Sequence, residues 1–368
     1  MATPNGACAT CGAPRAPLMC GRCRLAAYCN VPCQARDYKR RHRDACHAAV
    51  RDATLETVLR LCATYPEGAA AGTRDGSVLA FLRQDEALEL RAASRTCREA
   101  VAEHGWNDFF VSRSIIKRNV AGWRKCFPLA CAANLEGNET LADADFVYLR
   151  GVRKVSIMGC NQNTISDAAF VHLRGIHTLI MTGCNQATIM DAAFAHLRGI
   201  HSLDMGGCNQ TTITDAGFAH LRGIHTLVIV DCDQATITDA AFLHLRGIHT
   251  LNMGGCNQAT ITDAAFAHLR GVHTLYMWGC NQDTITDAAF AHLRGIHTLS
   301  LTGCSQITDA ALVHLLGIHT LRLDYCTQIT DAAMVHLLGI RELNIVGCSR
   351  LTDATFMQLK HRGATIER

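Results

Sequence analysis

Ile200-His201-Ser202-Leu203-Asp204-Met205-Gly206-Gly207-Cys208 is one copy of a phrase that recurs along the C-terminal two-thirds of this 368-residue chain. A second phrase, such as Thr214-Asp215-Ala216-Gly217-Phe218-Ala219-His220-Leu221, follows each copy. The cysteine that closes the first phrase returns at six intervals of 24 residues and then two of 22, as Cys160, Cys184, Cys208, Cys232, Cys256, Cys280, Cys304, Cys326 and Cys348. A fixed period of this length predicts a solenoid with a long recognition surface.

Each repeat reads as a strand, a turn, a short helix and a return loop. Strands such as Leu251-Asn252-Met253 are expected to stack as a parallel sheet with a spacing of ~4.8 Å. A glycine such as Gly199 follows the helix, where a left-handed residue is needed. Asp, or the Thr before it, suits the helix N-terminus, and the column is Asp167, Asp191, Asp215, Asp239, Asp263, Asp287, Asp309, Asp331 and Asp353.

The strand phrase Ile-x-x-Leu-x-Met-x-x-Cys and the phrase Ile213-Thr214-Asp215-Ala216 resemble the cysteine-containing leucine-rich repeats typical of F-box proteins. The resemblance implies an α/β solenoid over residues 141–368, a horseshoe with the parallel sheet inside and short helices outside. Residues 111–140 are expected to cap its first repeat, because the apolar end of a solenoid must be covered.

The repeats differ from one another mainly in two columns that strand alternation places on the concave face. One column contains Asp204, Asn252, Tyr276 and Arg322, and the other contains Trp278 and Asp324. Aromatic and arginine side chains are typical interface anchors, although exposed positions can also simply drift. The predicted target-binding residues are Asp204, Asn252, Tyr276, Trp278, Arg322, Asp324 and Tyr325.

Cysteine and histidine columns also run through the repeats. We expect the thiols to point inward and bond weakly to backbone, rather than to form disulfides or bind a metal. Histidines such as His196, followed by Arg198, suit the negative end of the helix. The alternative is that this flank binds phosphate or responds to pH, although the Asp column argues against a strong anion site.

Seven cysteines and one histidine at close spacing precede the repeats, as Cys8, Cys11, Cys20, Cys23, Cys29, Cys33, His42 and Cys46. Eight such ligands suffice for two closed, tetrahedral, structural zinc sites and leave no open position for catalysis. A segment of this size has too small a core to fold without the metal.

The pattern over residues 8–46, with the phrase Tyr28-Cys29-Asn30-Val31-Pro32-Cys33-Gln34, resembles the MYND zinc finger. The family implies an interleaved cross-brace, with Cys8, Cys11, Cys29 and Cys33 on one Zn²⁺ and Cys20, Cys23, His42 and Cys46 on the other. It also implies that the finger docks a short peptide of a partner protein.

Residues 74–110 have apolar residues at helical spacing. Phe81-Leu82, Leu88-Glu89-Leu90-Arg91 and Ser94-Arg95 resemble the F-box, a short helical segment that binds the adaptor subunit of cullin-RING ubiquitin ligases. The resemblance implies that the adaptor is bound by Leu79, Phe81, Leu82, Leu88 and Leu90.

Composition narrows the function further. An apolar content of 49% excludes a disordered chain, and the net charge is +3. Twenty cysteines without an N-terminal secretion signal indicate a reducing compartment, cytoplasmic and/or nuclear, and no apolar run reaches membrane-spanning length. No nucleophile–base set or phosphate loop indicates an enzyme.

These patterns predict the substrate receptor of a cullin-RING ubiquitin ligase, a monomer within a larger complex. The adaptor, a target on the concave face and a peptide on the finger are its expected partners. Nucleic-acid binding through the basic finger is a weaker hypothesis, and it predicts an affinity that depends strongly on salt. The alternative is a scaffold without ligase activity that bridges two proteins. The missing Leu-Pro opening of the F-box favours this alternative.

Overall fold

The chain divides into two units, Met1–Cys131 and Ala132–Arg368. The computed structural model describes residues 18–19, 27–28, 79, 82–93, 95–107, 109 and 119–368. Each unit is considered by itself.

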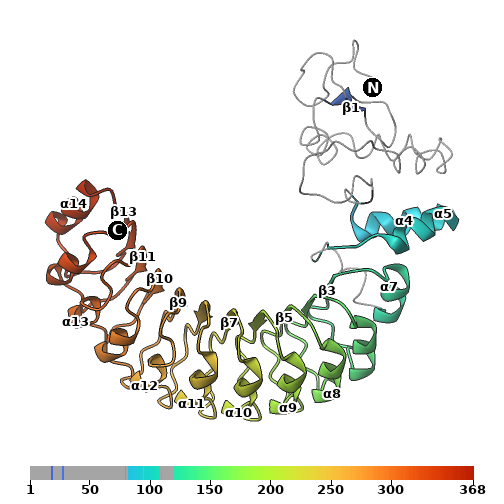
Figure 1. Ribbon diagram of the computed structural model, residues 1–368, viewed down its shortest axis with the longest axis horizontal. Coiled ribbons are helices and arrows are strands. Elements are labelled where there is room, and N and C mark those ends of the chain that lie inside the picture. The colour runs from blue at the N-terminus through green and yellow to red at the C-terminus, as the bar shows by residue number, and fades with distance from the viewer. Residues whose placement is uncertain are drawn as a thin grey trace. The chain divides into compact units, whose positions relative to one another are not determined.

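The second unit is a solenoid built on an 11-stranded parallel sheet whose strands follow one another in sequence order. Figure 1 shows the strands along the inner side of its arc and the helices along the outer side. The strands are β3 (Ala132–Asn134), β4 (Lys154–Ser156), β5 (Thr178–Ile180), β6 (Ser202–Asp204), β7 (Thr226–Val228), β8 (Thr250–Asn252), β9 (Thr274–Tyr276), β10 (Thr298–Ser300), β11 (Thr320–Arg322), β12 (Glu342–Asn344) and β13 (Thr365–Glu367).

The outer layer consists of single helical turns, most of which continue as 3-10 helix. The predicted horseshoe, with its sheet inside and short helices outside, is confirmed for this unit. The α-helices are α8 (Asp167–Phe170), α9 (Asp191–Phe194), α10 (Asp215–Phe218), α11 (Asp239–Phe242), α12 (Asp263–Phe266), α13 (Asp309–Leu312) and α14 (Asp353–His361). The 3-10 helices are η4 (Asp143–Leu149), η5 (Val171–Leu173), η6 (Ala195–Leu197), η7 (Ala219–Leu221), η8 (Leu243–Leu245), η9 (Asp287–His292) and η10 (Asp331–Leu337).

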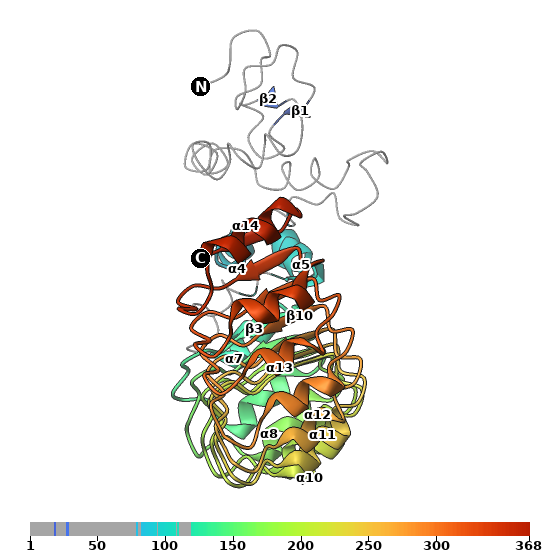
Figure 2. The same ribbon diagram turned by 90° about the vertical axis from the view of Figure 1, so that its left-hand side faces the viewer.

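The sheet begins at β3, ahead of residue 141, so part of the expected cap already pairs as a strand. From there the register keeps equivalent residues opposite one another, as Leu179 opposite Leu203. Figure 2 looks along the stack from its C-terminal side and shows the last repeats in front of the earlier ones. Because the register never slips, every side-chain type forms a column along the solenoid.

The core lies between the sheet and the helices. In each middle repeat the central strand leucine, the apolar residue two positions on and the helical phenylalanine are fully buried, as are Leu227, Ile229 and Phe242. Alternation along the strand sends these side chains inward and leaves their neighbours on the concave face. The core is therefore made of columns, one residue of each kind from every repeat.

Polar side chains join each repeat to the next along the helix N-termini. Thr214 caps α10, because its Oγ1 accepts a hydrogen bond from the Ala216 amide at 3.2 Å. Asp191 of the preceding repeat accepts hydrogen bonds from the Thr214 amide at 2.8 Å and from the Thr214 hydroxyl at 2.7 Å. The threonine thus supplies the cap, and the Asp column links neighbouring repeats.

The first unit contains a two-stranded antiparallel pair, β1 (Leu18–Met19) with β2 (Ala27–Tyr28). The helices among its described residues are α4 (Gln84–Ala93), α5 (Arg95–Glu103) and α7 (Val120–Cys126). The buried Trp123 indole donates a hydrogen bond to Gln84 Oε1 at 2.7 Å, which ties α7 to α4. The predicted helical character of this segment is confirmed for α4 and α5.

Candidate functional site

Most of the predicted target-binding residues of the concave face lie on or just after β9 and β11, the strands on either side of β10. Trp278, after β9, and Tyr325, after β11, are 38% and 61% exposed. The Arg322 side chain is 54% exposed, and Tyr276 is half-buried two strands away, with Ser300 of β10 between them in the register. Parallel strands lie ~4.8 Å apart, so these side chains fit within one surface of β9 to β11. Asp204 and Asn252 lie on β6 and β8 and are half-buried.

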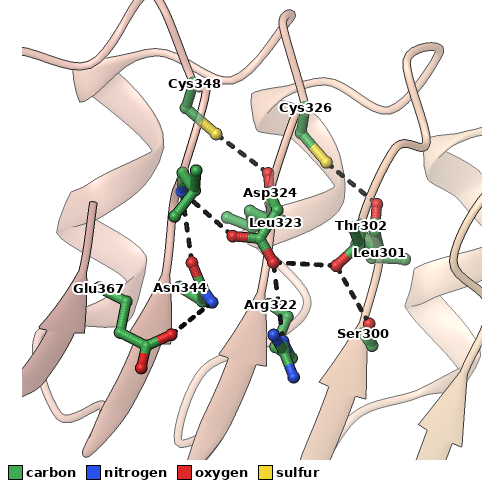
Figure 3. A network of polar contacts seen from close by, with 11 residues as sticks. Ser300, Leu301, Thr302, Arg322, Leu323, Asp324, Cys326, Asn344, Cys348 and Glu367 are labelled. Carbon is green, nitrogen blue, oxygen red and sulfur yellow. Dashed lines mark hydrogen bonds and ion pairs between the residues drawn. The ribbon is translucent and has the colours of Figure 1, made fainter.

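Asp324 differs from the expected exposed anchor, because it is 95% buried. Figure 3 shows its carboxylate at the centre of a polar network. One oxygen accepts a hydrogen bond from the Thr302 hydroxyl at 3.1 Å and lies 3.6 Å from Arg322 Nε. The other accepts from the Val346 amide at 3.1 Å. Asp324 therefore serves to position Arg322, whose side chain is left exposed.

A similar arrangement occurs five strands away at Asp204. Its Oδ1 accepts hydrogen bonds from the Thr182 hydroxyl at 2.9 Å and from the Gly206 amide at 3.0 Å. At the other end of the face, Asn344 Nδ2 donates to Glu367 Oε2 at 2.8 Å. The polar side chains of this face are thus held by neighbouring strands, and a partner would meet a preformed surface.

Two glycines complete the aromatic part of the face and were not among the predicted site residues. A methyl group on Gly254 would overlap the Trp278 indole, so the absence of a side chain there lets the ring lie flat against the neighbouring strand end. Gly347 stands in the same relation to the Tyr325 ring. Their signal in the sequence is a glycine one repeat away from each exposed aromatic residue.

Tyr325 also has a left-handed backbone, with φ of 61°. Glycine fills this turn position in other repeats, as Gly207 and Gly279 with φ of 64° and 67°. Apart from Tyr325, Asp231 is the one non-glycine residue with positive φ in the described part of the chain, at 53°. A side chain in this conformation costs roughly 1–2 kcal/mol, and such strain gathers at functional sites.

We expect Tyr325→Gly to be more stable than Tyr325→Ala by about 1 kcal/mol, because both variants lose the ring but the alanine retains the strained backbone. Urea unfolding of the two proteins measures the difference. As a matched pair at a relaxed position, Thr327→Gly should be no more stable than Thr327→Ala. Equal stability at position 325 would mean that the left-handed turn carries no strain.

Imidazole rings stack along the edge where the chain enters each strand. His177, His201, His225, His249, His273, His297 and His319 lie with ring centroids 4.4–4.5 Å apart and planes inclined by 11–27°. In His225, as in most of the column, Nδ1 lies about 3.2 Å from the hydroxyl of the next residue, Thr226. Burial lowers the pKa of His225, and the neighbouring His201 and His249 lower the pKa further. The same causes lower the pKa of His273.

We expect the solenoid to lose stability as the pH falls below about 6.5, the ordinary histidine pKa. The unfolded chain then binds protons at these two positions more readily than the folded chain does, because the folded-state pKa of His225 and of His273 is lowered, so the free energy of the unfolded chain falls relative to the folded state. Above that pH both states are neutral and the stability is fully present. Replacing His225 and His273 by Asn should flatten the dependence between pH 7.5 and 5.5 in urea titrations. His361→Asn, outside the stack, should leave the slope unchanged, and an unchanged slope in the double variant would contradict the assignment.

The thiols of the cysteine column are buried, free of disulfides and bonded to backbone, as expected. Each thiol donates to a backbone carbonyl of the preceding repeat, for example Cys208 Sγ to Met181 O at 3.1 Å. Burial, with the neighbouring Cys184 as a smaller cause, raises the pKa of Cys208 to about 12. The thiols of Cys160 to Cys348 are free and buried, so they act as protonated donors within the core.

The predicted zinc ligands, Cys8 to Cys46, lie outside the described residues. Their donor set of seven thiols and one imidazole fits zinc, which favours these soft ligands in closed tetrahedral shells. Among the residues that the structure describes, no group of three or more His, Cys, Asp or Glu side chains could hold a metal ion. The sequence of the finger is therefore the observation that implies zinc binding.

The predicted adaptor-binding residues fall into two groups. Leu79 and Leu82 are buried within their unit, at 6% and 7% exposure, whereas Leu88 and Leu90 on α4 are half-buried. Phe81 lies outside the described residues. Any adaptor contact would thus use Leu88 and Leu90 before the two buried leucines.

No helix in the described parts of the chain has the length and apolar character needed to cross a membrane.

Comparison with known proteins identifies the finger and the fold. The family model of the MYND finger matches residues 8–46, which implies that this segment binds zinc. No curated protein matches the chain.

Among solved structures, the Toll–Spatzle complex from Drosophila is similar to the solenoid, with a TM-score of 0.53 and 13% identity over 68% of this chain and 37% of that chain. The TLR13–ssRNA13 complex has the same TM-score and 16% identity, over 66% and 36%. This chain spans less than two-fifths of either protein. The similarity, with the parallel sheet and short helices, identifies a leucine-rich-repeat solenoid that follows an N-terminal MYND finger.

Proposed function

We propose that this chain is a protein-recognition scaffold and that the concave face from β9 to β12 holds its main partner. The observation that carries the proposal is the exposure of Trp278, Arg322 and Tyr325 on a face that has no core to fill. Elsewhere in the strands, the central residues repeat almost unchanged and are buried. Exposed aromatic and arginine side chains on a rigid surface are typical of binding anchors.

The chemistry of this face suits a mixed apolar and polar protein surface. Trp278 and Tyr325 offer broad rings, each resting on a glycine of a neighbouring strand end. Arg322 keeps its terminal nitrogens available, because Asp324 engages its Nε. Since neighbouring strands already hold these side chains, little conformational entropy is lost when a partner binds.

Trp278→Ala should weaken the partner complex by about 2 kcal/mol, a loss of roughly thirtyfold in affinity. The three chains, wild type, Trp278→Ala and the control Leu243→Ala at an exposed position of the convex face, are used to capture proteins from cell extract. The partner is the protein that the wild type and Leu243→Ala retain and that Trp278→Ala does not. Calorimetry with the purified partner then measures the loss. Equal retention of all captured proteins by the three chains would move the binding site away from the concave face.

A finer proposal is that the chain is the substrate receptor of a cullin-RING ubiquitin ligase, with no catalysis of its own. The F-box-like sequence over residues 74–110 supports it, together with the paired helices α4 and α5. The concave face would then hold the target, the finger would carry two structural zinc ions and bind a peptide, and the chain would be a monomer in the complex. A scaffold without ligase activity is the alternative, and the missing Leu-Pro opening favours it.

Direct calorimetry with the ligase adaptor subunit distinguishes the two. If the chain is a ligase receptor, it should bind the adaptor with micromolar affinity or tighter. The affinity should fall by about tenfold or more in Leu88→Ala/Leu90→Ala, because these half-buried side chains would form the contact. Leu129→Ala, an exposed position in the same unit, should bind as the wild type does. An absence of binding by the wild-type chain would leave the scaffold.

A further inference from the structure

The return loops that lead from each helix to the next strand have the sequence His-Leu-Arg-Gly-Ile-His, with Val in place of Ile in one copy. We call this side of the solenoid the return-loop edge, comprising residues 172–177, 196–201, 220–225, 244–249, 268–273 and 292–297. It lies apart from the concave face, since it precedes the strands. Each copy contributes one exposed arginine, and the row is Arg174, Arg198, Arg222, Arg246, Arg270 and Arg294.

Among the described residues, none of these six arginines has a carboxylate within ion-pair distance, in contrast to Arg322 with Asp324 and Arg368 with Asp353. The sequence of the edge explains this, because none of the six segments contains Asp or Glu. Like charges repeated once per repeat repel one another, and the repulsion favours binding of a chain of opposite charge.

The first five arginines instead contact the histidine one repeat further on. Arg222 Nε donates to His244 Nδ1 at 3.3 Å, and Arg174 Nε donates to His196 Nδ1 at 3.3 Å. An imidazole that accepts at Nδ1 is neutral and carries its proton on Nε2. The histidines thus orient the guanidinium groups without neutralising them.

The carboxylates of the solenoid are engaged or lie elsewhere. Both oxygens of an Asp such as Asp191 accept hydrogen bonds from Thr214 of the next repeat. The exposed Asp231, Asp233 and Asp283 follow the strands, in the turns on the other side of the sheet. The hydrogen bonds of the Asp column leave the Asp charge in place, and Asp167 and Asp215 oppose the lowering of the pKa of His196 and His244 on the edge. The Asp column therefore reduces the positive potential of the return-loop edge, as expected from the sequence, but forms no ion pair with its arginines in the part of the chain that the structure describes.

The row changes character after Arg294. Leu316 takes the place of the arginine in the next repeat and is 64% exposed. A ligand along the edge would therefore meet six cationic groups followed by an apolar one. With one arginine per repeat and strands ~4.8 Å apart, the row extends over roughly 24 Å, the length of about seven extended residues.

We propose that the return-loop edge binds an acidic segment of a partner protein, an extended run of Asp and Glu residues that ends in an apolar residue against Leu316. A nucleic acid fits less well. Sequence-tolerant binding of single strands relies on free aromatic faces, and the rings beside the arginines stack on one another from His177 to His319. The proposal concerns a second surface and does not depend on the concave-face function.

Fluorescence anisotropy with the full-length chain tests it. The probes are two labelled peptides of about twelve residues with alternating Glu and Asp, one ending in Leu and one in Gly, and a labelled oligothymidine of matched charge. Binding should weaken steeply with salt, as expected for exposed charges. The Leu-terminated peptide should bind the wild-type chain more tightly than the other two probes.

Arg198→Gln/Arg222→Gln/Arg246→Gln should lower the peptide affinity by about tenfold or more, since three of the six charges are removed. The matched control Arg350→Gln/Lys360→Gln/Arg362→Gln removes the same charge away from the edge and from the concave-face anchors, and it should change the affinity by less than about threefold. Leu316→Ala should weaken only the Leu-terminated peptide. Unchanged thermal unfolding verifies that each variant is folded.

Equal losses in the two triple variants would show attraction by net charge alone and overturn the proposal. Tighter binding of oligothymidine than of either peptide would assign the edge to nucleic acid instead. An absence of peptide binding by the wild-type chain would remove the site altogether, while leaving the concave-face proposal untouched.

Discussion

Hydrogen bonds and apolar contacts between adjacent repeats are the constraint on which this structure depends. A single repeat of strand and helical turn has too little apolar surface to fold by itself. Its leucine and phenylalanine become buried only when another repeat covers them, and its threonine cap and cysteine thiol find their partners in the preceding repeat. The solenoid is therefore stabilised along one dimension, by nearest neighbours. The same stacking that builds the core also aligns every surface side chain into a column.

This alignment explains what could be read from the sequence. The 24-residue period determines the repeat, and alternation within the strand separates buried leucines from exposed positions. The inward direction of the thiols follows from the same pattern. The position of each helix N-terminus could also be predicted, because Thr and Asp are strong signals there. Which of the two residues caps the helix could not be predicted, since that depends on how the aspartate of one repeat reaches the threonine of the next.

The sequence was less informative wherever a side chain finds its partner in another repeat. Asp324 looked like an exposed charge, yet it is buried because Thr302 and the Val346 amide converge on it. Gly254 was not among the predicted site residues, yet it makes room for Trp278. The contacts of the first five arginines of the return-loop edge with the histidine one repeat further on could not be seen either. A column can be read from one sequence, but contacts between columns depend on rotamers and on the twist between repeats.

The near identity of the repeats has a consequence for how such a protein can change. Recombination between two almost identical copies can add or remove a whole repeat, and both joints would still present the contacts that each neighbour requires. Such an event would alter the separation between surface groups by the width of one strand, ~4.8 Å, without disturbing the core. Trp278 lies on a 24-residue repeat and Arg322 on a 22-residue repeat, so a repeat gained or lost between them would change their separation. The distance between the two groups is therefore a quantity that evolution can adjust in discrete steps.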